Sequence, residues 1–384
     1  MKIPTFAALY LMQGVLGQMP PSQDGPLPHK LETLEPKYFK ELGSQRVKIS
    51  YGPISLPAGD DEKTHGHWSN RQLNTKFPCG DCLITAWTPN LVFADDGKTA
   101  NANNNIWLHH VGFTNLNRTD NVCENDWPER MNVNGNERST FDFTLKGTRK
   151  AGYFLRSTDH IFMATNILNM NPAPHTVVLT IEFEFLPGTP SDFDIVFPIW
   201  LDVKGNCLAH PLPPKDARVF TARGPTTGWV SKWSGDLILA VPHIHDGNTR
   251  QEIFLDDKLV CTSVPAYGET SEFVSHKGDS HGGHDHGSSE HHYHVSSISQ
   301  CANVAKLVPG NKLTIASHYD MEKHAPMKDH GGTEEAIMAI QFLHVVRPRE
   351  EGIAAVLASK PGNLTAFSEQ VTKNGVGAGT IVVP

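Results

Sequence analysis

Residues 177–185 read VVLTIEFEF, and this stretch decides the fold. Leu179 and Ile181 fall on one face of an extended strand, while Glu182 and Glu184 fall on the other, because successive side chains of a strand point to opposite faces. Such alternation is typical of an antiparallel strand with one buried face.

Similar runs recur along the chain and are separated by clusters of Gly, Pro and Asn. They cover residues 81–92, 106–113, 160–168, 312–318 and 336–346. No long stretch has the 3.6-residue period of a helix. Many short strands with turn signals between them indicate an all-β protein made of sandwiches or jelly rolls.

Length and composition set broad limits on the class of protein. The chain has 384 residues, enough for two domains of about 100–200 residues each. Its 32 Gly and 27 Pro indicate a loop-rich folded protein. The formal net charge of −8 argues against nucleic acid or an anionic membrane surface as the main partner.

The N-terminal segment predicts secretion. Lys2, a short apolar run and small residues near Gly17 fit a signal peptide over residues 1–17, and a Pro-rich leader follows over 18–35. Secreted proteins form disulfides, and the six cysteines allow 15 pairings. Two sequons, at Asn117 and Asn363, are compatible with a secreted glycoprotein.

A Gly, Asn and Pro interruption over residues 202–216 marks a domain boundary near residue 205. We therefore predict the following layout: an N-terminal β-sandwich over 36–204, a C-terminal one over 205–350, and a tail over 351–384. Within the second domain, residues 275–295 hold seven histidines among Gly and Ser, which predicts a long loop. Cys79 and Cys82 lie outside any thioredoxin-like pattern, so a small structural loop is the preferred interpretation.

A His-x-His pair ends the apolar run of residues 236–247, and it is the first candidate metal site. On a strand, His243 and His245 share a face with Leu237, Leu239 and Val241. Imidazole suits both copper and zinc, so the pair is a bidentate clamp for either metal. The alternative is two histidines satisfied by ordinary hydrogen bonds.

His109 and His110 are adjacent within the apolar run 106–113. Neighbouring residues on a strand face opposite ways, so one metal can take both only at a bulge or a strand end. The alternative is that one ring packs in the core while the other meets solvent.

Met338 shares a strand face with Ile340 and Phe342. A thioether sulfur is a soft ligand that selects copper over zinc, although a methionine on a strand more often packs in a core. The residues before it read HGGTEE, at 330–335.

Together these motifs resemble a known group of proteins. His109-His110 in one half, His243-Ile244-His245 in the other, and Gly-Gly-Thr followed by Met338 are similar to the peptidylglycine α-hydroxylating and dopamine β-monooxygenases. The chain more closely resembles the stress-upregulated nodulin-type family. The stretches that carry this resemblance lie between about residues 45 and 348: 77–80, 107–110, 241–247, 255–269 and 295–301.

The resemblance implies two jelly-roll domains in tandem that face a solvent-filled cleft and carry one copper each. His109 and His110 would belong to an electron-storing site. His243, His245 and Met338 would form the catalytic site, which binds oxygen. Cys261 would pair with Cys301 in the second domain.

One position departs from the family pattern. Asn166 stands where the third histidine of the first copper site is expected, and an amide oxygen is a poor ligand for reduced copper. His175 is a nearby substitute in the sequence. The first site is therefore expected to be weakened or lost.

We therefore expect a secreted, extracellular copper-binding protein that resembles the ascorbate-dependent monooxygenases, an oxygen-using hydroxylase of an unknown small-molecule or peptide substrate. The alternative is a non-catalytic copper-binding or metal-scavenging protein on the same fold, with metal exchange through the histidine-rich loop. A weaker alternative is a cell-wall interaction protein with vestigial sites.

Overall fold

The computed structural model describes residues 26–123, 126–204, 207, 211–276, 291–327 and 334–364. The predicted signal peptide, residues 18–25 of the leader, residues 277–290 of the histidine-rich loop and the end of the tail lie outside the described residues.

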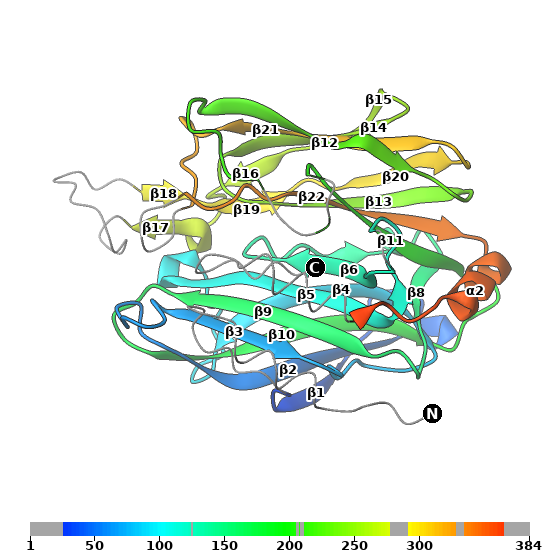
Figure 1. Ribbon diagram of the computed structural model, residues 1–384. Helices are drawn as coiled ribbons and strands as arrows, with labels where there is room; N and C mark the ends of the chain where they lie inside the picture. The colour runs from blue at the N-terminus through cyan, green and yellow to red at the C-terminus, as the bar shows by residue number, and fades with distance from the viewer. Residues whose placement is uncertain are drawn as a thin grey trace.

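Most of the described chain is β-strand, arranged in stacked layers (Figure 1). The largest sheet has ten strands, in the order β1 (His29–Leu34), β2 (Gln45–Leu56), β10 (His175–Pro187), β4 (Cys82–Phe93), β8 (Ala151–Leu155), β11 (Asp194–Asp202), β22 (Ala339–Arg347), β13 (Gly235–Ile244) and β20 (Cys301–Leu307), with β7 (Phe141–Asp142) paired to β4. An all-β fold is confirmed.

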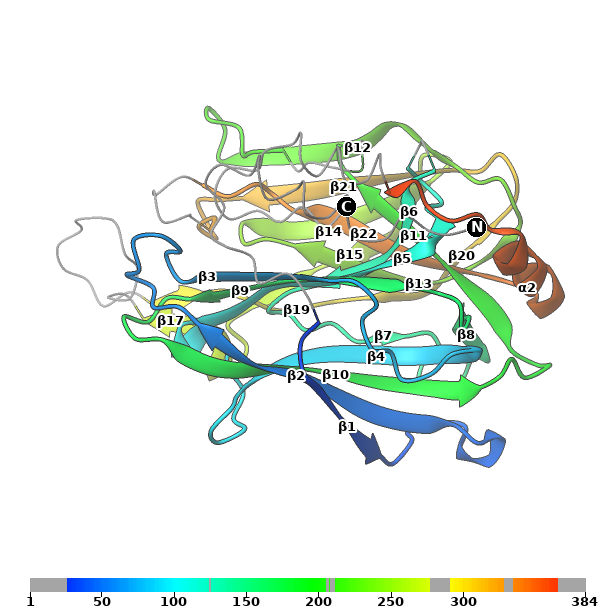
Figure 2. The ribbon, with the colours of Figure 1, turned by 60° about the horizontal axis from the view of Figure 1, so that its bottom comes forward.

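Two four-stranded sheets accompany the large one, and Figure 2 shows both from a second direction. The first sheet contains β3 (His67–Gln72), β9 (Ile161–Asn169), β5 (Ile106–Thr119) and β6 (Pro128–Asn134). The second contains β12 (Val219–Val230), β21 (Lys312–Asp320), β14 (Asn248–Leu255) and β15 (Lys258–Ser263). Two short pairs complete the set: β16 (Pro265–Tyr267) with β19 (Val295–Ile298), and β17 (Val274–His276) with β18 (His291–Tyr293).

The six strands predicted from alternation are all present, as β4, β5, β9, β10, β21 and β22. On β10 the predicted inner residues Leu179 and Ile181 are fully buried. The predicted outer face is partly covered as well, because the carboxylate of Glu184 accepts the backbone N–H groups of Lys37 and Tyr38. Short alternating runs thus predicted the strands well.

The predicted tail begins with a helix, α2 (Arg349–Ala358). The helix places Gly352 and Val356 against the large sheet, where Val356 packs with Ile195. Sequence periodicity did not reveal it, because the helix is short and its apolar residues do not gather on the buried side: Gly352 is buried, whereas Ala354 and Leu357 are exposed.

Two main cores lie on either side of the strands β13 and β22. Leu239, Val241 and Met338 pack in the core of the first half, whereas Leu237 packs in the core of the second. The prediction that Leu237 shares a face with the other residues of the run is wrong. A register shift between Leu237 and Leu239 in the pairing of β13 with β22 reverses the face.

Strand β11 connects the two halves of the chain within the large sheet. It precedes the predicted boundary at residue 205, yet it pairs antiparallel with β22 of the second half and parallel with β8 of the first. The ligand-bearing strands β5 and β13 therefore belong to sheets that share a core across that boundary.

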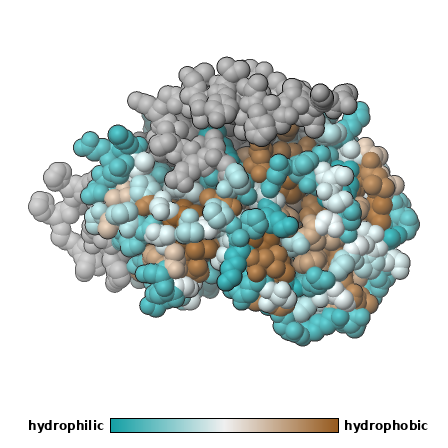
Figure 3. All heavy atoms as spheres, turned by 90° about the horizontal axis from the view of Figure 1, so that it is seen from below, coloured by the Kyte–Doolittle hydropathy of each residue, from teal (hydrophilic) through white to brown (hydrophobic). Residues whose placement is uncertain are grey.

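Three disulfides are present: Cys79–Cys82, Cys123–Cys207 and Cys261–Cys301. The first confirms the small structural loop, and the third confirms the pairing that the resemblance implied. Among the described residues, no helix is long and apolar enough to cross a membrane. The face seen from below in Figure 3 mixes hydrophilic and hydrophobic residues.

Candidate metal centre

The two histidine motifs meet in the interior of the protein. Ligand nitrogens of His109, His110 and His245 all lie within 4.8 Å of one another. His243 adjoins this trio, with its ring centroid 5.3 Å from that of His110 and 6.0 Å from that of His245. This differs from the two separate sites across a cleft that the resemblance implied, since residues of both motifs occupy one buried group.

A bulge in β5 lets adjacent histidines serve the same group. The pairing of β5 with β9 shifts register between Leu108 and His110, as the sequence required for both rings to face one metal. The rings of His109 and His110 consequently lie side by side, with centroids 4.1 Å apart. The four histidines, His109, His110, His243 and His245, are 6%, 1%, 2% and 7% exposed, so protein surrounds the group almost completely.

Met338 brings sulfur to the same place from the residue that precedes β22. Its Sδ lies 3.2 Å from Nε2 of His110. As predicted, Met338 shares the face of Ile340 and Phe342, and all three pack in the core of the first half. The thioether therefore touches both the core and the histidine group.

Three of the rings are held by an acceptor at Nδ1. His109 donates to Oδ1 of Asn166 at 2.7 Å, His243 to the carboxylate of Glu137 at 2.7 Å, and His245 to the carbonyl of Ala336 at 2.9 Å. An N–H donated at Nδ1 fixes the tautomer and leaves the Nε2 lone pair for a metal.

The orientation of Asn166 differs from that of a ligand. Its Oδ1 faces Nδ1 of His109, while its amide group donates to Oγ of Ser69 at 2.9 Å. The side chain therefore holds the ring of His109 from behind. The other suggested substitute, His175, lies at the start of β10 with its ring against Phe93, apart from the group.

Two partly buried carboxylates that the sequence did not reveal lie beside the rings. Oε2 of Glu335 lies 3.3 Å from Nε2 of His109 and 3.8 Å from Nδ1 of His245. Burial alone would raise the pKa of Glu335, but the neighbouring histidines, His109 first, lower it to about 2. In the same way, His243 outweighs burial and lowers the pKa of Glu137.

No sequence signal marked Glu137, which lies in an irregular segment more than a hundred residues from its partner. Glu335 was visible only as part of the stretch before Met338. Its function depends on a contact with β5 that alternation within one strand cannot predict.

A small cavity adjoins the histidine group. Its volume is about 30 Å³, and its walls include His109, His243, His245, Glu137 and His294. His294 and Asp246, which both line this cavity, are hydrogen-bonded to each other: Nδ1 of His294 donates to Asp246 at 2.7 Å. A space of this size accommodates a water-sized molecule.

Comparisons with known proteins bear on the chemistry. No protein-family profile matches the chain. The chain is 28% identical over 316 residues to "Probable copper-dependent oxygenase M1" of Phoma sp. (strain ATCC 20986 / MF5453), covering 82% of this chain and 75% of that protein. It is 27% identical over 253 residues to "Probable copper-dependent oxygenase clz3" of Cochliobolus lunatus, covering 66% of this chain and 76% of that protein.

The chain is a distant relative of proteins named as probable copper-dependent oxygenases.

Among solved structures, PNGase F from Flavobacterium meningosepticum aligns at a TM-score of 0.35 with 10% identity, covering 79% of this chain and 96% of that one. PNGF-II aligns at a TM-score of 0.37 with 10% identity, covering 76% and 65%.

Proposed function

We propose that this protein is a secreted copper-dependent oxygenase with a single copper site. The copper would be held by His109, His110 and His245 with Met338, and His243 would complete the donors from the adjoining side. One observation carries the proposal: imidazole nitrogens from β5 and from the end of β13 lie together in the interior, next to the sulfur of Met338. The two distant relatives named as copper-dependent oxygenases support it.

The donor set fits copper. Imidazole suits copper and zinc alike, and the soft thioether of Met338 favours copper over zinc, calcium or magnesium. Nε2 of His243 is buried and has no hydrogen-bond partner among the described residues, as expected of a nitrogen that awaits a metal. Bound copper would supply redox chemistry with molecular oxygen, and the surrounding protein would keep bulk water away from it.

The residues behind the ligands would position them. Asn166, Glu137 and the Ala336 carbonyl fix the rings of His109, His243 and His245. Such partners of metal-bound histidines typically contribute 10–100-fold to metal affinity or activity. Glu335 would compensate positive charge next to His109 and His245.

Secretion is part of the proposal because three disulfides form in the structure, and disulfides persist in oxidising compartments. The predicted signal peptide is tested separately. N-terminal sequencing of protein collected from the medium should begin after residue 17, and an uncleaved intracellular protein would contradict it.

The decisive experiment is copper counting on His110→Ala. The native chain should bind about one copper, and the variant close to none, because His110 contacts both the other rings and Met338. His160→Ala, which replaces an exposed histidine outside the group, is the control. Two coppers in the native chain, or full copper in His110→Ala, would refute a single site.

The second candidate function is copper binding without catalysis. The near-complete burial of the rings and the small size of the adjoining cavity favour it. Oxygen consumption with ascorbate distinguishes the two. An oxygenase should exceed the rate of the same concentration of free copper once a substrate is supplied, whereas a carrier should stay at or below that rate with every compound tried.

A further inference from the structure

A larger cavity lies next to the histidine group, on the other side of Glu137. Its volume is about 440 Å³, within the range of pockets that hold small organic molecules. Glu137 lines both this cavity and the 30 Å³ space beside the rings. A molecule bound in the larger cavity would therefore lie one side chain away from His243.

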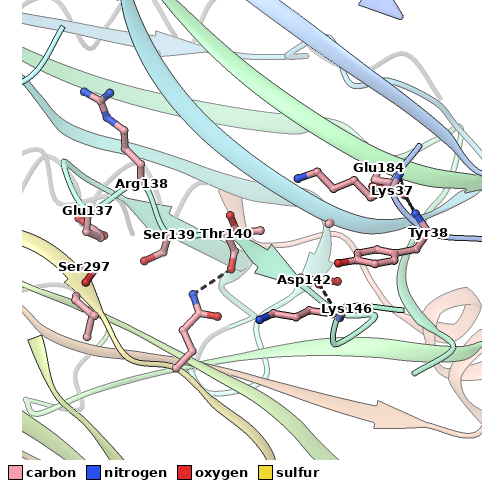
Figure 4. A pocket seen from close by; sticks show the side chains of 13 residues that line it. Lys37, Tyr38, Glu137, Arg138, Ser139, Thr140, Asp142, Lys146, Glu184 and Ser297 are labelled. Atoms are coloured by element: carbon pink, nitrogen blue, oxygen red, sulfur yellow. Dashed lines mark hydrogen bonds between the residues drawn. The ribbon is translucent and has the colours of Figure 1, made fainter. Parts of the chain in front are cut away.

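The two ends of this cavity differ in character (Figure 4). Glu137 and Ser297 stand at the end near the histidines, and Lys37, Tyr38 and Lys146 stand at the far end. The side chains of these last three extend in the same direction, toward the segment of Ser139 and Thr140. Arg138 points away, since its guanidinium donates to Asn90 and to the carbonyl of Ala100.

The acids at the far end are already satisfied. Oε1 of Glu184 accepts the backbone N–H groups of Lys37 and Tyr38 at 2.9 and 2.8 Å. Asp142 accepts the N–H of Thr144 and the N–H of Lys146, both at 2.9 Å. Backbone donors thus stabilise these two carboxylates, which keep their negative charge, and neither carboxylate forms an ion pair with the ammonium group of Lys37 or Lys146.

The donors at the far end have no partner among the described protein groups, and both lysines are exposed to solvent. Neither Lys37 nor Lys146 forms an ion pair through its ammonium group with any described residue, and the hydroxyl of Tyr38 has no hydrogen-bond partner among them. The hydroxyl stays a donor, because burial and then the charges of Asp142 and Glu184 raise its pKa. Two ammonium groups and a phenol hydroxyl that extend into the same part of the cavity match an acceptor that carries negative charge.

We infer that this cavity binds a small organic acid, with its carboxylate against Lys37, Tyr38 and Lys146 and its uncharged end toward Glu137 and His243. This inference rests on the proposed function in taking the acid to be the substrate. The anionic Glu137 would keep a second carboxylate away from the histidine end, so a monocarboxylate with a neutral tail fits best.

The test uses 3-phenylpropionate and its neutral counterpart, 3-phenylpropionamide, as probes. Affinities are measured by titration calorimetry on the full chain as isolated and again after copper removal. The native protein should bind the acid at least several-fold more tightly than the amide. The double variant Lys37→Gln/Lys146→Gln should lose roughly 10-fold in affinity for the acid and little for the amide, because hydrogen bonds to charged groups are the stronger ones.

The matched control is Lys98→Gln/Lys312→Gln, which removes the same charge from lysines that pair with Asp96 and Asp257 outside the cavity. It should bind the acid as the native protein does. Equal affinity for acid and amide in the native protein, or equal loss in both double variants, would overturn the inference. Binding of the acid to copper-free protein keeps this result separate from failure of the copper proposal.

Discussion

At the residue scale, Met338 has both a structural and a chemical role. Its side chain is 3% exposed and packs with Ile340 and Phe342, so it contributes to the core whatever binds nearby. Its sulfur also lies 3.2 Å from His110. Leucine has a similar volume without the sulfur, so one substitution separates the two roles.

Met338→Leu should therefore change metal preference more than stability. A volume-conserving swap costs under about 1.5 kcal/mol of unfolding free energy. Loss of the soft ligand should weaken the binding of reduced copper by roughly 10-fold or more while affecting oxidised copper less. Competition with a chelator selective for reduced copper measures this. An unchanged affinity would remove Met338 from the ligand set.

His344 is buried for a different reason, because aromatic side chains surround it. Its ring centroid lies 4.9 Å from that of Phe143 and 5.5 Å from that of Phe141. Burial, which outweighs a backbone hydrogen bond, lowers the pKa of His344 to about 3. The folded protein therefore keeps this imidazole neutral at pH values where the unfolded chain protonates it.

The sign of the pH effect follows from the lowered pKa. Since the unfolded chain binds a proton below about pH 6.5 and the folded one does not, stability should fall by about 1.4 kcal/mol per pH unit from there toward pH 3. His344→Leu should remove this contribution to the slope in urea unfolding between pH 6 and 4. The profile of the control His160→Leu should match the native one, and an equally steep profile for His344→Leu would contradict the assignment.

At the element scale, short-range pattern predicted strands but not their irregularities. Alternation located β10 and β22, and the adjacency of His109 and His110 required a bulge that β5 indeed has. The same reasoning failed for Leu237. A register shift changes which face a side chain takes, and its position depends on the partner strand β22, more than ninety residues away.

Helix α2 shows how closely a second element packs on the large sheet. A Cβ at Gly352 would lie 2.5 Å from Cβ of Ile195 on β11. Alanine normally stabilises a helix by about 0.5–1 kcal/mol relative to glycine. In this position the overlap with Ile195 would separate helix from sheet, so the packing cost should exceed that gain.

Gly352→Ala is thus expected to destabilise the protein by about 1–2 kcal/mol, the usual cost of overpacking less the helix gain. Leu357→Ala on the exposed side of the same helix should stay within about 0.5 kcal/mol of native. Denaturant unfolding measures both. Stabilisation by Gly352→Ala would show that the helix moves away from Ile195 at little cost.

At the scale of the whole molecule, the candidate ligands come from both halves of the chain. His109 and His110 belong to β5, while His245 and Met338 lie at the ends of β13 and β22. The sequence could supply the residue types and their strands. The single group they form, and the contacts of Glu137 and Glu335, depend on how the halves pack together, which no local pattern encodes.

Under the proposed function, a metal bound by residues of both halves should stabilise the fold as a unit. A ligand at about a thousand times its dissociation constant adds about 4 kcal/mol to the unfolding free energy. Calorimetry should show a single transition that moves upward with copper in the native protein. In His110→Ala that transition should not respond. Independent melting of the halves, with copper shifting only one of them, would contradict this expectation.

Different acceptors at Nδ1 make three of the imidazoles electronically unequal. His109 donates its Nδ1 hydrogen to the neutral amide of Asn166, and His245 donates to a peptide carbonyl, whereas His243 donates to the anionic Glu137. A carboxylate draws the shared proton toward itself and enriches the opposite nitrogen with electron density. The most strongly donating nitrogen therefore belongs to His243, next to the wall that the two cavities share. The histidine group is therefore asymmetric, and its most electron-rich ring lies on the side of the larger cavity, which Glu137 also lines.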